Sequence, residues 1–244
     1  MSLIDIKETV NENVPKQKPL KEKFDVYIPN VAEGLSRRNG MIYVISGSGG
    51  SGKTNLLLNM FKSTKLYRMK FDNIFYVCPM SSFLSVEKHP FANHDKVHHE
   101  LTLDLLESIY HQLDELKESQ EDAHYSCVII DDFADSLKDV AIQKQLNKML
   151  IKARHIQCSF IFMVQSYYYF PKILRKQITY LTLFKSKNKE EFETLTKELI
   201  CLNKENAQIL YDYVFDQPYT HLDIDTVENK YYKNFNPLEL IFEK

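Results

Sequence analysis

Eight residues, GSGGSGKT at 47–54, constrain the fold more than any other part of the chain. They contain four of its six glycines and lie between the apolar run Met41–Ser46 and a leucine-rich segment. They fit the pattern G-x-x-x-x-G-K-[ST], in which glycines let a loop between a strand and a helix close around a phosphate group. A helix that begins near Lys53 would point the positive end of its dipole at that anion. The segment therefore predicts a strand, a phosphate-binding loop and a helix.

The lysine and the hydroxyl of this motif predict a nucleoside triphosphate with Mg²⁺ as the ligand. In the pattern, Lys53 reaches the β- and γ-phosphates and the Thr54 hydroxyl binds Mg²⁺. The alternative is a glycine-rich turn followed by an incidental Lys-Thr pair, and the flanking strand and helix patterns disfavour it. The predicted nucleotide-binding residues are Gly47, Ser48, Gly49, Gly50, Ser51, Gly52, Lys53, Thr54 and Asn55.

Beyond the loop, apolar runs alternate with helical patterns, which predicts an α/β fold with a mostly parallel central sheet sandwiched between helices. Helical stripes recur every three or four residues, as in Leu105, Ile109, Leu113 and Leu116. The runs predicted as strands are short and rich in Val, Ile, Tyr or Phe: Met41–Ser46, Ile74–Cys78, Cys127–Ile130, Cys158–Val164, Tyr180–Phe184 and Tyr219–Ile224.

The ends of the chain differ in character from its centre. Residues 1–23 are rich in Lys, Glu, Asn and Pro, which predicts a flexible N-terminal arm. Residues 24–244 contain neither an internal repeat nor a Pro/Gly-rich linker, so we expect a single domain built around the phosphate loop.

Two carboxylates close the apolar run YSCVIIDDF at 125–133. A carboxylate at the end of a buried strand beside a phosphate loop holds Mg²⁺, so Asp131 is predicted as a metal ligand. Asp132 is then placed to orient and polarise the attacking water. The alternative is that both residues only close the strand at a solvated turn. Gln165 closes the run SFIFMVQS and is predicted to sense the γ-phosphate, or else to satisfy backbone groups of its loop.

Arg154, in IKARHIQ, falls at the end of a predicted helix and just before a predicted strand. A cation there complements the negative end of the helix dipole. It also suits an arginine finger that reaches the γ-phosphate of a neighbouring subunit. The residues alone leave these two roles equally open.

Composition excludes several classes of protein. No glycine follows Gly52, so neither the D-x-x-G of Ras-type GTPases nor the glycine-rich signature of ABC transporters is present. The segment FKSKNKEE has Glu191 where the guanine-reading motif N-K-x-D requires Asp. No apolar run approaches the roughly 18 residues of a membrane span, and the N-terminus lacks the apolar segment of a signal peptide, so we expect a protein that is not secreted.

Neither cysteines nor histidines predict a metal centre. The four cysteines share no C-x-x-C spacing and are interpreted as buried reduced thiols. The histidines at 89, 94, 98 and 99 have no accompanying cysteine and are interpreted as part of a polar surface loop. The formal net charge of −2 excludes a surface that is basic throughout, so contact with nucleic acid would need a local patch.

The ordered set GSGGSGKT, VIIDD, KARH and FIFMVQSYYYFPKILRK, followed by YLTLFKS, resembles the genome-packaging ATPases of large DNA viruses and virophages. These form the poxvirus-type branch of the FtsK/HerA superfamily, and the similarity covers roughly Val26 to Phe235. The resemblance implies a RecA-like P-loop fold with strand order 5-1-4-3-2. It also implies a homo-oligomeric ring, a pentamer or hexamer, that uses ATP hydrolysis to drive double-stranded DNA into a preformed capsid.

The resemblance also assigns roles and partners. Lys53 and Thr54 take the positions of the phosphate loop. Asp131 takes the role of the Mg²⁺ ligand and Gln165 that of the polar sensor. Arg154 takes the role of the trans-acting finger, with Arg175 as second choice. One position departs from the pattern, because the superfamily has a catalytic Glu where this chain has Asp132. The implied partners are double-stranded DNA and capsid or vertex proteins. The implied location is the host-cell cytoplasm, the viral factory or the virion.

A basic segment follows Gln165. Lys172, Arg175 and Lys176, with Tyr167–Tyr169 beside them, suit sequence-independent contacts with DNA phosphates. Equally, the tyrosines could pack the next helix.

Two other functions fit a phosphate loop. A small-molecule kinase would transfer phosphate to an added nucleoside without stimulation by DNA. A nucleotide-gated interaction module would turn over ATP very slowly whether or not DNA is present.

Overall fold

The computed structural model describes residues 27–87, 89–119, 124–186, 188–200 and 202–241. The predicted arm at 1–23 lies outside the described residues. Within the described ranges, no helix combines the length and apolarity that crossing a membrane requires.

Five parallel strands form the centre of the sheet, as predicted. They coincide with the apolar runs of the sequence to within one residue at each end, because each is buried on both faces. Across the sheet they are β2 (Asn73–Val77), β4 (Ser126–Asp131), β5 (Cys158–Val164), β1 (Ile42–Ser46) and β6 (Tyr180–Phe184). Numbered along the chain among themselves and read from β6, these strands have the order 5-1-4-3-2, which confirms the order that the resemblance implies.

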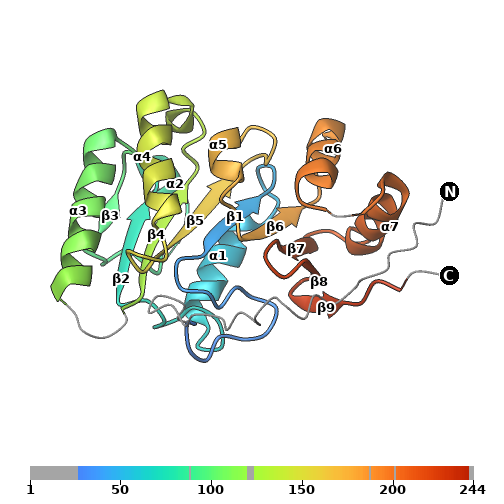
Figure 1. The fold of residues 1–244 in the computed structure, drawn as a ribbon, viewed down its shortest axis with the longest axis horizontal. Helices are drawn as coiled ribbons and strands as arrows, with labels where there is room; N and C mark the ends of the chain where they lie inside the picture. The colour runs from blue at the N-terminus through green and yellow to red at the C-terminus, as the bar shows by residue number, and fades with distance from the viewer. Residues whose placement is uncertain (1–26, 88, 120–123, 187, 201, 242–244) are drawn as a thin grey trace, which may run out of the picture.

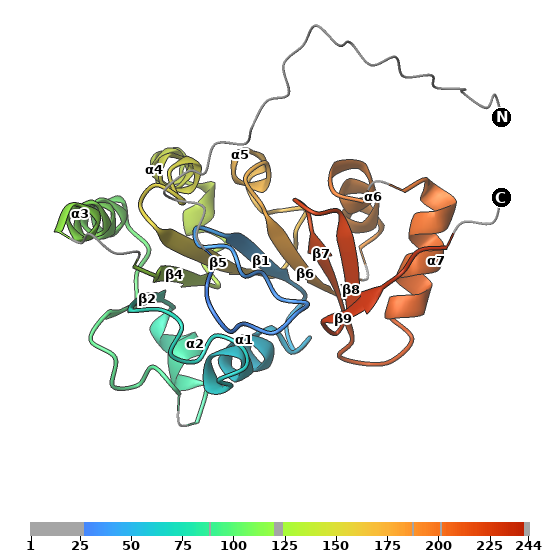
Figure 2. The same ribbon diagram turned by 60° about the horizontal axis from the view of Figure 1, so that its bottom comes forward.

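Helices cover both faces of this sheet (Figures 1 and 2). One face carries α3 (Leu103–Ser119), α4 (Val140–Ile151), α5 (Lys172–Arg175), α6 (Lys189–Glu198) and α7 (Lys204–Val214). The other face carries α1 (Lys53–Lys62), α2 (Met80–Leu84) and residues 28–35. The predicted stripe on α3 is correct in its centre, since Ile109 and Leu113 are fully buried against the sheet. The fold class is therefore the α/β sandwich expected from the sequence.

The sheet extends beyond the parallel strands on both sides. On one side a two-residue strand, β3 (Val97–His98), pairs with β2. A short 3₁₀ helix, η1 (Ser136–Lys138), lies outside the sheet and connects β4 to α4. Beyond β6 the sheet becomes antiparallel through β7 (His221–Asp225), β8 (Lys230–Lys233) and β9 (Asn236–Leu238). The sequence predicted β7 but not β8 or β9, because these strands are short and exposed at several positions and carry no apolar run.

The cysteine prediction is confirmed where the structure describes it, and the histidine prediction is partly wrong. Cys78, Cys127 and Cys158 are buried free thiols, whereas Cys201 lies outside the described residues. His89 is not on a surface loop: it is only 6% exposed and packs 4.2 Å from the Phe83 ring, measured between ring centroids. The rings of Tyr76, Phe83 and Phe91 pack around it in tilted arrangements, which accounts for its burial.

Candidate functional site

The phosphate loop connects β1 to α1 at the carboxyl edge of the parallel strands, where ligands bind in open α/β sheets. Gly52 has φ of 105°, a left-handed conformation that side chains rarely adopt, and Lys53 begins the helix directly after it. At Gly47, an added Cβ would lie 2.8 Å from Cβ of Phe184. The first-turn residues Thr54 and Asn55 follow, with backbone N–H groups that have no partner within a helix. The predicted strand, loop and helix are thus in place.

The Lys53 side chain folds back onto its own loop. Its ammonium donates hydrogen bonds to the carbonyl oxygens of Gly47 and Ser48, the latter at 3.1 Å. Burial lowers the pKa of Lys53, and the carboxylates of Asp131 and Asp132 act against that shift. The charged nitrogen is therefore held over the loop, beside the position where the motif places a phosphate.

Asp131 is the last residue of β4, and its side chain is buried beside Tyr76 and Cys78. It is 5% exposed, and its Oδ2 accepts hydrogen bonds from the Tyr76 hydroxyl at 3.0 Å and the Cys78 thiol at 3.8 Å. Burial raises the pKa of Asp131 to about 6, while the Tyr76 hydrogen bond and Lys53 oppose the shift. Burial also raises the pKa of Cys78 to about 12, so the thiol stays protonated and remains a donor.

Asp132 and Gln165 meet although 33 residues separate them in the chain. Gln165 Nε2 donates to Asp132 Oδ1 at 2.9 Å, and the Asp132 backbone N–H donates to the Met163 carbonyl on β5 at 3.3 Å. Asp132 has φ of 59°, a left-handed conformation uncommon outside glycine, and its side chain is exposed. The turn after β4 thus directs a solvated carboxylate toward the end of β5.

These residues fit a magnesium–nucleotide complex. Mg²⁺ usually takes one or two protein oxygens and completes its shell with water and phosphate oxygens. Asp131 and Thr54 supply that number, and no group of three or more metal-binding side chains occurs among the described residues. Two buried hydroxyls beside the loop ends, on Ser51 and Ser166, have no hydrogen-bond partner in the structure. When held by Asp131 and Thr54, Mg²⁺ would neutralise negative charge on the phosphates of the nucleotide.

Arg154 lies at the opposite edge of the sheet. It belongs to the turn between α4 and β5, and its backbone nitrogen is 2.7 Å from the position of a Cβ added to Gly40, which shortly precedes β1. The five residues of β1, about 16 Å in length, separate this edge from the phosphate loop. The structure thus does not bring Arg154 to the other predicted site residues of its own chain.

The basic segment after β5 divides into buried and exposed parts. Arg175 has a side chain only 10% exposed, pairs with Glu198 at 3.2 Å and lies over the Tyr167 ring at 5.2 Å. This placement favours a structural role for Arg175 over the DNA contact and the finger predicted for it. Lys172 and Lys176, by contrast, are exposed.

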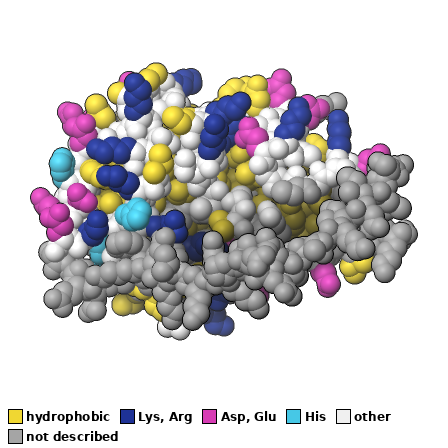
Figure 3. All heavy atoms as spheres, in the orientation of Figure 1, with side chains coloured by type: hydrophobic (Ala, Val, Ile, Leu, Met, Phe, Trp, Pro, Cys, Tyr) yellow, Lys and Arg dark blue, Asp and Glu magenta, His cyan; other side chains and the backbone are white. Residues whose placement is uncertain are grey.

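The tyrosines beside them also divide. Tyr167 is fully buried, whereas Tyr168 is 38% and Tyr169 is 75% exposed. On the face in Figure 3, among the described residues, Lys and Arg side chains alternate with acidic and apolar ones and form no continuous basic surface. A DNA contact on this face would therefore be local.

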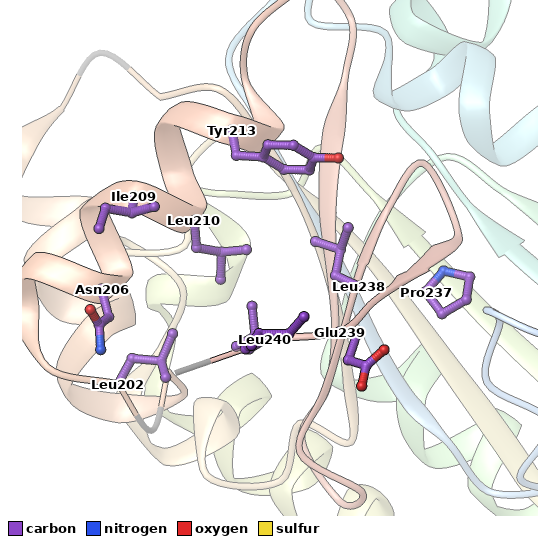
Figure 4. A pocket seen from close by; sticks show the side chains of 10 residues that line it. Leu202, Asn206, Ile209, Leu210, Tyr213, Pro237, Leu238, Glu239 and Leu240 are labelled. Atoms are coloured by element: carbon purple, nitrogen blue, oxygen red, sulfur yellow. The ribbon is translucent and has the colours of Figure 1, made fainter. Parts of the chain in front are cut away.

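A cavity beside the phosphate loop contains residues that the sequence did not single out. Its volume is about 420 Å³, and it lies between the loop, the end of β6 and the segment at 215–220. The aromatic side chains at its wall belong to Phe184, Phe215 and Tyr219. A larger cavity of about 510 Å³, between α7 and the chain from β9 onward, is lined mainly by leucine and isoleucine side chains and lies away from the loop (Figure 4).

The family of the chain follows from its sequence. The family model of the Poxvirus A32 protein matches residues 33–229. The chain belongs to this family. A comparison with curated protein sequences finds no match. Together, the phosphate loop, the fold and the family identify the chain as a viral P-loop ATPase.

Several solved structures have a similar fold. The genome packaging NTPase B204 of Sulfolobus turreted icosahedral virus 2, in complex with AMPPCP, has a TM-score of 0.57 at 16% identity, covering 84% of this chain and all of B204. EssC (ATPases 2 and 3) of Geobacillus thermodenitrificans has a TM-score of 0.57 at 14% identity, covering 80% of this chain and 39% of EssC. The pCW3 conjugation coupling protein TcpA, with ATPγS, has a TM-score of 0.56 at 15% identity, covering 86% of this chain and 67% of TcpA.

Proposed function

We propose that the protein is an ATP-driven motor that moves double-stranded viral DNA into a preformed capsid. The observation that carries the proposal is the gathering of Lys53, Asp131, Asp132 and Gln165 at one sheet edge in a chain of the A32 family. B204, whose structure has the same fold, is a genome packaging NTPase. Residues 24–244 would form one ATPase unit of a ring, with capsid or vertex proteins as further partners in the host cytoplasm or viral factory.

The site suggests how hydrolysis proceeds. Lys53 would leave the carbonyls of its loop and bind the β- and γ-phosphates, while Thr54 and Asp131 would hold Mg²⁺. Asp132, solvated and held by Gln165, would accept a hydrogen bond from the attacking water and orient it in line with the γ-phosphorus. Asp is one methylene shorter than the Glu of the superfamily pattern, and the hydrogen bond from Gln165 fixes where its carboxylate sits.

The aromatic cavity beside the loop suits the nucleobase. It opens next to Ser48–Ser51, where the phosphates would lie, and its wall carries aromatic rings on which a planar base can stack. Removing the Tyr219 ring by Tyr219→Ala should weaken ATP binding while leaving tripolyphosphate binding unchanged.

ATP turnover with and without duplex DNA tests the proposed function. Wild-type protein should hydrolyse ATP and be stimulated by DNA, and Lys53→Ala should be inactive in both conditions. Turnover by Lys53→Ala would contradict the site. Very slow turnover unaffected by DNA would favour the interaction module, and phosphate transfer to an added nucleoside would favour the kinase.

The DNA contact needs a separate test. Lys172→Ala with Lys176→Ala removes two exposed charges beside Tyr169, whereas Lys62→Ala with Lys65→Ala removes two exposed charges elsewhere. The first pair should lower DNA affinity. It should also reduce the slope of log K against the logarithm of the salt concentration by up to about 2, as expected for two lost phosphate contacts. The second pair should change neither, and equal effects of both pairs would argue against a local contact.

A further inference from the structure

Glu191 is a buried carboxylate that joins two loops of the site. It lies in the first turn of α6 and is 2% exposed. Its Oε1 accepts a hydrogen bond from the Ser46 hydroxyl at 3.0 Å and another from the Tyr167 backbone N–H at 2.5 Å. Ser46 immediately precedes the phosphate loop, and Tyr167 follows Gln165 by two residues. A single oxygen atom thus links the nucleotide loop to the loop that carries the sensor.

Helix capping does not explain this placement. A Glu at the third position of a helix commonly reaches back to the backbone N–H of the N-cap residue. In α6 the N-cap is Asn188, whose backbone N–H donates instead to the Ser186 hydroxyl at 3.1 Å. The Asn188 side chain accepts from the Glu190 backbone N–H at 2.9 Å. The helix start is therefore capped by other groups, and Glu191 is directed at Ser46 and Tyr167.

The same helix holds Tyr167 at a second point. The Tyr167 hydroxyl donates to Glu198 Oε2 at 2.9 Å, and Glu198 lies seven residues after Glu191, two turns further along α6. Arg175 of α5 pairs with the same oxygen at 3.2 Å. Helices α5 and α6 lie on the same face of the sheet (Figures 1 and 2), so this contact ties them together. The buried Tyr167 is thereby fixed at both its backbone and its hydroxyl.

The exposed end of this arrangement is Tyr168, Tyr169 and Lys172, which we call the lip. These residues directly follow Tyr167 or lie on α5, whose Arg175 is fixed by Glu198. At the other end, Lys53 must leave the Gly47 carbonyl to reach a phosphate, and Gly47 is the neighbour of Ser46. Ser46, the residue before the phosphate loop, is therefore one hydrogen bond away from Glu191, and Glu191 is one hydrogen bond away from Tyr167, the residue before the lip.

We propose that Glu191 is a positioning residue that makes the lip respond to the nucleotide in the phosphate loop. A buried hydrogen bond to a carboxylate holds its partners in a defined geometry, because a weakened or misplaced bond in the interior is costly. Movement of Ser46 would therefore displace Glu191 or break the bond, and either outcome reaches Tyr167. The inference rests on the proposed function for its nucleotide, but not for DNA.

The absence of tryptophan from the chain provides the test. Tyr169→Trp places a single fluorescent reporter on the lip, at a position 75% exposed, and Tyr213→Trp places one on α7, at a position 60% exposed. Saturation with Mg²⁺ and a non-hydrolysable ATP analogue should change the emission of Trp at 169 and leave that of Trp at 213 unchanged. Binding of the analogue is measured separately by calorimetry, so each signal is read at known saturation.

Two variants remove the link, and two serve as controls. Ser46→Ala, which deletes only the hydroxyl, and Glu191→Ala should reduce the emission change at 169 at least fivefold at saturation. Glu191→Gln should retain most of it, because its amide oxygen still accepts both hydrogen bonds. Ser159→Ala is matched to Ser46→Ala, because Ser159 is equally buried in the sheet and its hydroxyl has no partner. It should respond as the parent reporter does.

The outcomes separate this inference from the proposed function. Failure of the parent protein to bind the analogue would refute the nucleotide site itself. Binding with a silent reporter at 169, or a full response in Ser46→Ala, would overturn the role of Glu191 and leave the ATPase assignment intact. A lost response in Ser159→Ala would assign the effect of Ser46→Ala to packing and also overturn the inference.

Discussion

The two edges of the parallel sheet carry different parts of the predicted chemistry. The carboxyl edge brings together Lys53, Asp131, Asp132 and Gln165. The amino edge carries Arg154, whose backbone packs against Gly40 a strand's length away from the phosphate loop. One chain therefore gathers at one edge the residues that we propose act on phosphate, metal and water, but not this arginine. If Arg154 takes part in hydrolysis, it must act on the site of another subunit, which makes the two edges separable by experiment.

The largest effect should come from removing the arginine at the amino edge. Arg154→Ala should lower ATP turnover about a thousandfold, the size of an arginine-finger contribution. Mixing it with Lys53→Ala protein should restore part of the activity, because some interfaces then combine an intact loop with an intact arginine. Full activity of Arg154→Ala alone, or no recovery in the mixture, would show that the amino edge has no catalytic role across an interface.

The next largest effect should come from Asp131 at the carboxyl edge. Asp131→Asn should lower turnover at least about a hundredfold by removing charge stabilisation at the phosphates. Yet it should stabilise the ligand-free fold, because the folded state raises the pKa of Asp131 from 3.8 to about 6 and so disfavours its charge. That difference corresponds to up to about 3 kcal/mol at pH 7.

Asp135→Asn is the matched control for this variant. Asp135 lies four residues further on, is exposed and pairs with Lys138 at the surface. It should leave turnover and thermal unfolding nearly unchanged. If Asp131→Asn lowered both the turnover and the unfolding temperature, the carboxylate would stabilise the fold. It would then not be a functional group whose burial costs stability.

How much of each edge the sequence predicts depends on how local the signal is. The loop, the helix after it and the ends of β4 and β5 are contiguous motifs, so Lys53, Asp131 and Gln165 were placed correctly at the carboxyl edge. The position of Arg154 just before the strand β5 was also predictable, because the apolar run of β5 marks where that strand begins. The bond between Gln165 and Asp132, and that between Tyr76 and Asp131, depend on which strands are neighbours, which no local pattern reveals.

The remaining gaps have the same cause. Glu191 was considered only as part of a failed guanine-binding motif, because its partners Ser46 and Tyr167 are distant in the chain. Arg175 was expected among DNA contacts, because a Lys/Arg cluster gives no sign of which member pairs with a carboxylate on the next helix. Strands β8 and β9 escaped prediction, because half-exposed antiparallel strands lack the apolar runs that mark the parallel ones.

Substitution of one glycine at each edge compares how tightly the backbone is packed there. Gly40 has φ of 74°, and an added Cβ would lie 2.7 Å from the Arg154 nitrogen, so Gly40→Ala should lower the free energy of unfolding by roughly 1–3 kcal/mol. Gly49 in the phosphate loop has no atom within 4 Å of an added Cβ, so Gly49→Ala should change the free energy of unfolding by less than about 0.5 kcal/mol. Denaturant unfolding of both variants measures the contrast. Equal losses would show that the amino edge is no more tightly packed than the loop.

The smallest effect is the pH dependence of the carboxyl edge. With a pKa of about 6, Asp131 is mostly ionised at pH 7 and about one quarter ionised at pH 5.5, so affinity for Mg²⁺ with the ATP analogue should fall about fourfold.

The stability of the ligand-free protein should change in the opposite sense. Because the pKa of Asp131 is raised on folding, its contribution to stability is complete below its unfolded pKa of 3.8 and is lost as the pH rises through about 6. Calorimetric binding and thermal unfolding at both pH values separate the two trends. Affinity that stays constant down to pH 5.5 would show that binding of the metal and nucleotide does not depend on the ionisation of Asp131, and would remove it as the metal ligand.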